Sequence, residues 1–188
     1  MRRVLAFDVN ETLLDLGALD PQFRRAFGDA AARSEWFSQV IELAITAAST
    51  GHLVFGTLHT PSASKTVDRI IDVFPSEQQN KIRATLSESL RGVVAQNLFK
   101  RVDKKGRCAA LEILVFTTAV ANLVREGKTH QIPGMIQVGK KLGNTPLDDS
   151  IMEHLRMKRI APEEAYDKSL DKKKFRAFLA TPPMDDDV

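Results

Sequence analysis

The sequence lacks several features that are typical of secreted or membrane proteins. Its 188 residues include one cysteine, Cys108, so no disulfide bond can form within the chain, as is usual in a reducing compartment. No uninterrupted apolar stretch approaches the ~20 residues that a membrane-spanning helix needs. The chain starts with a basic and then apolar segment, but Asp8 ends this segment far short of a signal-peptide core. We therefore predict a cytoplasmic protein, in which Cys108 is a small residue beside a strand rather than a nucleophile.

Lysine is absent before Lys65, and all thirteen lysines lie between Lys65 and Lys174. The first forty residues carry five arginines against six acids, whereas the remainder carries 22 basic and 18 acidic residues. Such a shift favours two parts of different origin. The net charge of +3 is too small to indicate a nucleic-acid partner, and the hydrophobic content of 43% predicts a buried core.

Hydrophobic periodicity and turn residues predict an α/β protein. Strands are expected at residues 3–7, 53–58 and 111–116, the last two buried, with a turn at 103–106. A helix capped by Thr117 or Thr118 is expected to bury Val120, Leu123 and Val124. Residues 171–188 are expected to form a loose tail. The other expected helices span residues 21–27, 31–49, 62–74, 76–99, 132–142, 147–159 and 162–170, and the apolar positions of the second are Trp36, Phe37, Val40, Leu43, Ala44 and Ala47.

Residues 51–60 read GHLVFGTLHT and resemble the histidine box of the secretion ATPases, in particular of the branch that retracts type IV pili. The likeness continues through residues 63–75 and 86–96 and resumes at 106–107 and 112–114, in collinear order. The resemblance implies the C-terminal part of a RecA-like P-loop NTPase with a helical C-terminal region. It also implies ATP and Mg²⁺ as cofactors, a homo-hexamer or a pilus ATPase homologue as partner, and a peripheral position at the inner-membrane platform of the pilus.

The same resemblance implies which residues carry function. In the family the histidine at the position of His59 contacts the γ-phosphate side of the nucleotide, and an imidazole there can donate a hydrogen bond to the phosphate. The alternative is a strand-end histidine without a ligand. His52 is either a second nucleotide-sensing residue or a turn histidine. Residues 118–126 resemble the helix motif that the family needs for retraction, although Ala121 replaces its arginine and plain packing would give the same periodicity; the candidates there are Ala119, Asn122, Leu123 and Glu126.

The 188 residues contain no G-x-x-x-x-G-K-S/T loop, whose amides and lysine hold the phosphates of ATP in this family. One close candidate is residues 122–129, but Asn122 stands at the first glycine and the segment follows a predicted helix rather than a strand. The acidic elements that orient water and hold magnesium in the family precede the histidine box, and other residues stand at those positions here. We therefore expect a chain truncated of its Walker A and Walker B elements, without ATP hydrolysis of its own and without a metal site.

The first forty residues resemble a different family. Residues 4–15 read VLAFDVNETLLD and resemble the opening of a haloacid dehalogenase-type hydrolase. In that family a strand delivers an aspartate nucleophile and a loop threonine helps to hold it, which implies roles for Asp8 and Thr12. The later partners of that site are imitated at residues 113–117 and 148–149, where the pattern also fits the ATPase-like segment, so we interpret both matches as chance.

These observations divide the chain into a dehalogenase-like fragment at residues 1–40, an ATPase-like part at 41–170 and a tail at 171–188. Three functions remain open: part of a pilus retraction ATPase, a hydrolase that uses Asp8, and a non-catalytic partner of a hexameric pilus ATPase. Because the strands come from two sources, we also expect two partial sheets with uncovered edges.

Overall fold

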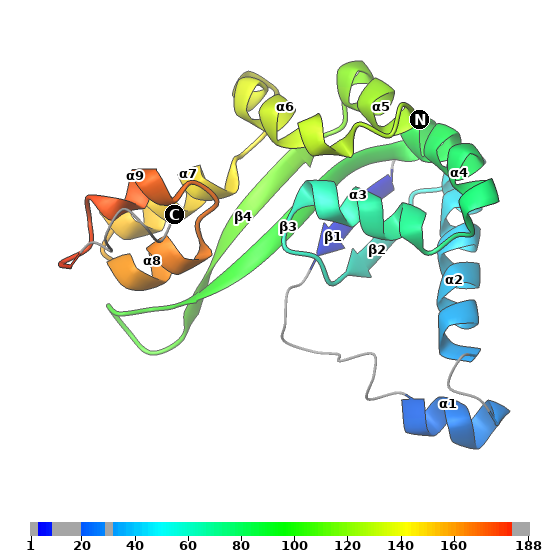
Figure 1. The fold of residues 1–188 in the computed structure, drawn as a ribbon, viewed down its shortest axis with the longest axis horizontal. Coiled ribbons are helices and arrows are strands. Elements are labelled where there is room, and N and C mark those ends of the chain that lie inside the picture. The colour runs from blue at the N-terminus through cyan, green and yellow to red at the C-terminus, as the bar shows by residue number, and fades with distance from the viewer. Residues whose placement is uncertain (1–3, 9–19, 29–31, 182–188) are drawn as a thin grey trace.

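A computed structural model describes residues 4–8, 20–28 and 32–181 of the chain (Figure 1). Its strands are β1 (Val4–Asp8), β2 (Phe55–Leu58), β3 (Leu90–Lys100) and β4 (Arg107–Val115). Its first helices are α1 (Asp20–Phe27), α2 (Ala32–Ser49), α3 (Ala63–Asp72), α4 (Ser76–Ser89) and α5 (Thr118–Arg125). Its later helices are α6 (Ile132–Val138), α7 (Leu147–Arg156), α8 (Pro162–Lys168) and α9 (Lys172–Arg176), with short 3-10 helices η2 (Thr129–Gln131) and η3 (Lys140–Leu142).

β1 is an inner strand of the sheet, although it comes first in the chain. The strand order is β2-β1-β3-β4, in which β1 pairs in parallel with both β2 and β3, and β3 and β4 form an antiparallel hairpin. Leu5 lies opposite Phe55, and Ala6 lies opposite Val93. The expectation of two partial sheets is therefore wrong, because the strand from the dehalogenase-like fragment joins the strands of the ATPase-like part in one sheet.

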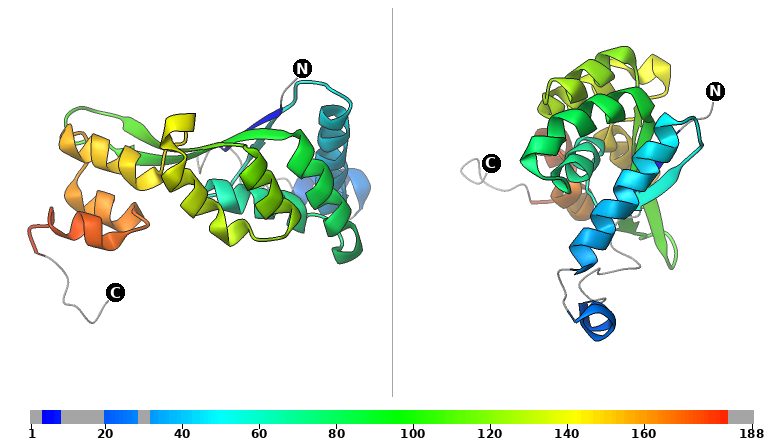
Figure 2. Two further views of the ribbon diagram at one scale, coloured as in Figure 1. Left: turned by 90° about the horizontal axis from the view of Figure 1, so that it is seen from above. Right: turned by 90° about the vertical axis from the view of Figure 1, so that its right-hand side faces the viewer.

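The hydrophobic core forms two clusters along the β3–β4 hairpin. Val93 and Leu114 face each other in register and belong to the larger cluster, which includes buried residues of α2 to α6. Phe99 and Ala110 belong to the smaller cluster, together with residues of α7, α8 and α9. Figure 2 shows the long hairpin running from one helical group to the other. The hairpin therefore joins the two parts of the core.

The outer edge of β4 is closed by the segment at residues 144–154. Alternate residues of β4 bond to this segment, which satisfies backbone groups that would otherwise lie unpaired at the sheet margin. The contacts are Val115 N to Asn144 Oδ1 at 2.6 Å, a two-way backbone exchange between Ile113 and Thr145, Leu111 N to Ser150 Oγ at 3.0 Å, and His154 Nε2 to Ala109 O at 2.9 Å. By contrast, no strand in the described ranges pairs with the outer edge of β2.

Several predicted elements are confirmed, and one is wrong. Helices form near most of the expected positions, Ser62 caps α3, and Thr117 rather than Thr118 caps α5. The expected helix at residues 76–99 ends at Ser89, where the backbone becomes extended at Leu90 and β3 begins. The apolar residues of this segment satisfy a helical pattern locally, but pairing with β4 and β1 places them in the sheet.

The burial of α2 and β2 also differs from expectation. The helix buries Ile41 and Ile45, whereas Trp36, Val40 and Leu43, which periodicity predicts to be inside, are substantially exposed. The expected buried strand at 53–58 is a short edge strand in which Phe55 is exposed. In both cases the side chains lie where the sheet ends at β2. No helix in the described part of the chain is long and apolar enough to cross a membrane.

Residues beyond 170 do not form a loose tail from the start. α9 follows directly, and its Phe175 is 0% exposed within the smaller cluster, whereas Phe178 nearby is 44% exposed. Phe175 follows three lysines in the sequence, so its burial cannot be predicted from the neighbouring residues.

We predict that Phe175→Ala lowers the free energy of unfolding by about 3–5 kcal/mol, because it leaves a cavity in the smaller cluster. Phe178→Ala is the matched control and should change the free energy by less than about 1 kcal/mol. Urea denaturation followed by circular dichroism measures both values. Equal effects of the two substitutions would contradict the packing of α9.

Candidate functional site

The carboxyl ends of β1 and β2 lie side by side at one edge of the sheet. Asp8 ends β1 and is the register partner of Leu58, which ends β2, and His59 follows directly. Two candidates that came from different family resemblances, Asp8 and His59, are thus brought to the same edge. Thr12 lies outside the described residues. In open α/β sheets, ligands bind beyond the carboxyl ends of parallel strands.

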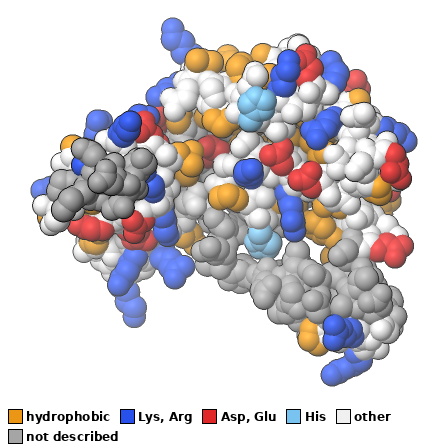
Figure 3. All heavy atoms as spheres, in the orientation of Figure 1, with side chains coloured by type: hydrophobic (Ala, Val, Ile, Leu, Met, Phe, Trp, Pro, Cys, Tyr) orange, Lys and Arg blue, Asp and Glu red, His pale blue; other side chains and the backbone are white. Residues whose placement is uncertain are grey.

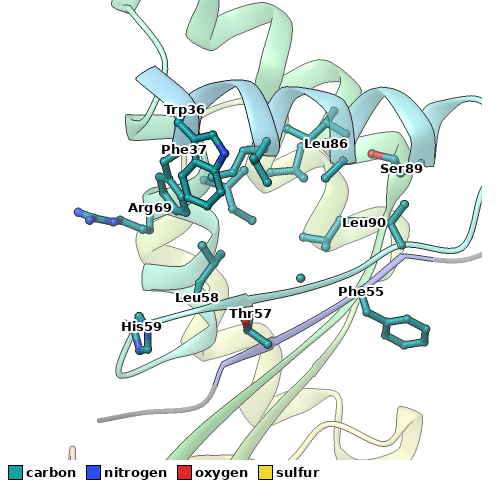
Figure 4. A pocket seen from close by; sticks show the side chains of 18 residues that line it. Trp36, Phe37, Phe55, Thr57, Leu58, His59, Arg69, Leu86, Ser89 and Leu90 are labelled. Atoms are coloured by element: carbon teal, nitrogen blue, oxygen red, sulfur yellow. The ribbon is translucent and has the colours of Figure 1, made fainter. Parts of the chain in front are cut away.

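A cavity of about 390 Å³ lies next to this edge, between α2 and β2. Figure 4 shows Trp36 and Phe37 pointing from α2 toward the space above β2, while Leu58 points into it from the strand. His59 and Arg69 lie at one end of the cavity. The cavity therefore combines apolar walls with two basic side chains at the end that adjoins the strand termini.

His59 is exposed, and the described residues give its imidazole no hydrogen bond or ion pair. The ring can therefore donate to or accept from a ligand that reaches the strand ends. On the face of the molecule seen in Figure 3, basic and acidic side chains are interspersed over its right-hand part rather than gathered by sign.

The loop after His59 is fixed from behind by hydrogen bonds to α3. The hydroxyl groups of Thr60 and Thr66 lie 2.6 Å apart and are buried, and Thr66 Oγ1 donates to Ser62 O at 2.9 Å. Ser62 Oγ accepts from Lys65 N at 3.4 Å and caps the helix. These contacts hold residues 60–62 against α3, so the position of His59 is set by the helix start.

Glu112 adds a buried carboxylate to this arrangement. It lies on β4, is only 4% exposed, and its Oε1 accepts a hydrogen bond from Ala63 N at 2.7 Å. Burial raises the pKa of Glu112 above its ordinary value; the Ala63 hydrogen bond opposes this shift and the charge of Asp148 adds to it. Glu112 therefore links the start of α3 to the hairpin through this hydrogen bond. Because the carboxylate is buried, its ionised form is destabilised.

His52 is not part of the same site as His59. It lies three residues before β2, and its Nδ1 is 3.2 Å from both Ala47 O and Thr50 Oγ1. Its backbone N–H donates to Ala47 O at 3.0 Å. These contacts satisfy carbonyl groups at the end of α2, which supports the interpretation of His52 as a turn histidine.

The candidates of the retraction-like helix lie on α5 and its cap. Val120 and Val124 are buried, Leu123 packs partly against the larger cluster, and Ala119, Asn122 and Glu126 are exposed. Arg125 donates to Asn122 Oδ1 at 3.3 Å and to Ser87 Oγ at 3.1 Å, which links α5 to α4. The helix thus packs on one face and presents an exposed surface, which is separate from the strand-end edge.

The residues present do not fit the phosphates of ATP at the strand ends. Residues 127–129 follow α5 and lead into η2, and Lys128 pairs with Glu126 at 2.8 Å, so this glycine-lysine segment is not a phosphate loop. β1 ends at Asp8 and the sequence continues with Val9, Asn10 and Glu11, where a phosphate loop would require glycines and lysine. Carboxylates repel phosphates, so the donors for a triphosphate must come from elsewhere.

Thr66, Arg69 and Glu112 all lie within segments that carry the ATPase resemblance, but none of them is a candidate site residue in the sequence analysis. The sequence does contain a signal that Glu112 has a structural partner. Glu112 is a charged residue within an apolar strand segment, and such a residue is rarely buried without a partner. Thr66 and Arg69 look like ordinary helix residues, and only the three-dimensional arrangement brings them to the loop and the cavity.

The fold is that of an α/β protein in which the parallel strands β1 and β2 end side by side. Residues 38–160, more than half of the chain, match the family model described as "Type II/IV secretion system protein". The chain therefore belongs to the type II/IV secretion system protein family.

Two relatives point to one branch of this family. The chain is 52% identical over 127 residues to a twitching motility protein of Neisseria gonorrhoeae, which covers 68% of the chain and 34% of that protein. It is 48% identical over 131 residues to the type IV pilus retraction ATPase PilT of Pseudomonas aeruginosa, with 70% and 38% covered. The chain thus spans little more than a third of the length of these relatives.

Solved structures agree with this fold. The crystal structure of the pilus retraction motor PilT with bound ADP has a TM-score of 0.63 and 27% identity, covering 92% of this chain and 54% of that chain. The ATPase DotB of Legionella pneumophila has a TM-score of 0.58 at 21% identity, with 87% and 50% covered. The family match begins at residue 38, so the dehalogenase-like interpretation of residues 1–40 stays a prediction.

We predict that Glu112→Gln becomes more stable relative to the parent protein as the pH rises from about 4 to about 8. The raised pKa of Glu112 means that folding favours its protonated form, so its contribution to stability is present below the ordinary pKa and is lost as the pH rises through the raised value. Glutamine keeps the acceptor for Ala63 N–H without the charge. Urea unfolding at several pH values measures the difference.

Glu126→Gln is the matched control for this experiment. The hydrogen bond from Lys128 lowers the pKa of Glu126, so its small contribution is present above the ordinary pKa and is lost as the pH falls. The two variants should therefore show pH trends of opposite sign relative to the parent. Parallel trends would contradict a buried, costly charge at Glu112.

Proposed function

We propose that this chain is part of a motor ATPase that retracts type IV pili, and that it supplies the histidine-box portion without hydrolysing ATP alone. Support comes from the match of residues 38–160 to the type II/IV secretion family and from the likeness to a twitching motility protein and a pilus retraction ATPase over 127 and 131 residues. The single observation that carries the proposal is the exposed His59 at the carboxyl end of β2, in a chain without a phosphate loop. The motor would work at the cytoplasmic side of the inner-membrane pilus platform.

In this proposal His59 faces the terminal phosphate of Mg-ATP that other parts of the motor hold. The hydrogen bonds behind residues 60–62 keep the strand end in place, and Arg69 lies at the same end of the cavity. An exposed imidazole without a partner among the described residues is free to donate to a phosphate oxygen. His59 would therefore report on the presence of the phosphate rather than perform the reaction, and the exposed face of α5 would contribute to retraction.

The same proposal requires a protein partner. Val40 and Leu43 on α2 are exposed apolar residues near the edge of β2 with which no strand of the described ranges pairs. Large exposed apolar patches mark interaction surfaces in many proteins. We propose that this face docks on an intact pilus ATPase homologue or on further copies of the chain in a hexamer.

A second candidate is a hydrolase of the haloacid dehalogenase type. The position of Asp8 favours it, because Asp8 ends an inner strand that has parallel neighbours on both sides. An aspartate nucleophile in such an enzyme forms an ester intermediate. The proposal then rests on Asp8 and Thr12 rather than on His59.

The first test is hydrolysis by the purified chain. We expect no phosphate release from Mg-ATP above background and no micromolar binding by calorimetry, while an intact retraction ATPase homologue is active in the same assay. Steady turnover by the chain alone would overturn the claim that it lacks independent activity. The panel includes p-nitrophenyl phosphate and a haloacid, because turnover that disappears in Asp8→Asn would favour the hydrolase instead.

The second test concerns docking. We expect the chain to co-elute with an intact pilus ATPase homologue in size-exclusion chromatography. Val40→Asp should abolish co-elution, because it places a charge beside the apolar cavity between α2 and β2. Val138→Asp is the matched control, since Val138 is 78% exposed on α6, away from this cavity, and co-elution should persist. Loss of co-elution in both variants, or none with the parent chain, would count against this surface.

A further inference from the structure

A second cavity lies on the other side of the loop that follows β2. It has a volume of about 410 Å³ and is bounded by Pro61 of this loop, the distal half of β3, the start of β4, and α8. In Figure 1, α8 lies beside the distal part of the β3–β4 hairpin. The cavity is separate from the apolar space between α2 and β2, and none of the functional roles discussed above uses its basic residues.

The cavity follows an open stretch of the β3 edge. Pairing of β3 with β1 ends at Val94, so the backbone groups beyond this point need other partners. α8 supplies them, because Lys168 Nζ donates to Leu98 O at 2.7 Å and Lys100 N donates to both carboxylate oxygens of Glu164, at 3.1 and 3.2 Å. Two side chains of one helix therefore close the edge and form one wall of the cavity.

The charges in the cavity are unbalanced. Three cations, Lys100, Arg107 and Lys168, line it together with a single carboxylate, that of Glu164. Glu164 already accepts from the backbone of Lys100 and pairs with Lys168 at 3.4 Å. Within the described ranges, neither the Lys100 nor the Arg107 side chain has a hydrogen bond or an ion pair. The local excess of positive charge is therefore not compensated by other residues that the structure describes.

The register of the hairpin also places the side chains of Lys100 and Arg107 next to each other. Lys100 and Arg107 are directly opposite each other in the antiparallel β3–β4 pairing, so their side chains leave the same face of the hairpin. Like charges at such a pair of positions destabilise a sheet. A bound anion between them would remove this repulsion.

The donors suit a phosphate group. The Arg107 guanidinium offers a planar fork for two oxygens, and the Lys100 ammonium offers a compact positive charge. Lys168 is held in place by Leu98 O and Glu164 and lies 5.0 Å from the centre of the Phe99 ring, so its charge is already positioned. A dianion balances the excess of two cations, which a single carboxylate does not.

We propose that this cavity binds a doubly charged phosphate group, either as a free phosphate or as the terminal group of a phosphorylated small molecule. Arg107 and Lys100 bind its oxygens, and Lys168 adds the third positive charge. The inference does not depend on the proposed role of His59, because the cavity uses different side chains and needs no hydrolysis.

The test is titration of the full chain with inorganic phosphate, pyrophosphate and ADP at low and constant ionic strength. We expect heat of binding in calorimetry and a rise in the unfolding temperature with ligand concentration. Arg107→Gln should weaken binding of inorganic phosphate and pyrophosphate by about tenfold or more, as expected for loss of a charge-assisted hydrogen bond. Lys104→Gln, in the hairpin turn and outside the cavity lining, is the matched control and should bind like the parent.

A separate readout needs no ligand. Arg107→Gln removes the like-charge pair, so in phosphate-free buffer it should unfold at a higher temperature than the parent, whereas Lys104→Gln should not. If phosphate and pyrophosphate bind and ADP does not, the site is specific for free phosphates. If all three bind, the site accepts any terminal phosphate group. Binding of ADP alone, no binding of any anion at millimolar concentration, or equal effects of the two substitutions would overturn the proposal.

Discussion

The need of backbone N–H and C=O groups for partners at the margins of the sheet organises this protein. One margin, the outer edge of β4, is closed by residues 144–154, which places α7 and the smaller cluster. The free stretch of β3 is closed by Glu164 and Lys168, which places α8. The outer edge of β2 has no strand beside it in the part of the chain that the structure describes, and Val40 and Leu43 on the neighbouring helix α2 are exposed. The edges of β3 and β4 that have hydrogen-bond partners thus lie beside helices of the core. The outer edge of β2 lies at the surface that we assign to a partner.

A buried carboxylate connects the core to the functional edge. Glu112 lies on the hairpin between residues of the larger and the smaller cluster and accepts from Ala63 N at the start of α3. Through the Thr60–Thr66 hydroxyl pair, the same helix start holds the loop that carries His59. Buried contacts therefore hold this loop in position. The part of the loop region that contacts Glu112 directly is the helix start, at Ala63 N.

Local signals in the sequence predict most helices and miss most of the pairing. The cap at Thr117 is predictable from the sequence, because a cap is a property of a few neighbouring residues. β3 was mistaken for helix, because only its partners β1 and β4 decide that residues 90–100 are extended. The approach of Asp8 to His59 could not be predicted, since it follows from the insertion of β1 beside β2, fifty residues away in the chain. The burial of Phe175 was hidden for the same reason: its neighbours in sequence are lysines, and its neighbours in space come from β3, α7 and α8.

The inner position of β1 has a consequence for synthesis of the protein. β1 leaves the ribosome before its partners at residues 55–58 and 90–94, which are made much later. Until then a short apolar strand has both edges free, and long-range parallel pairing is slow because loop closure must precede contact. The parallel part of the sheet can therefore be completed only after residues 90–94 have been made, and until then the edges of β1 are exposed to non-native pairing.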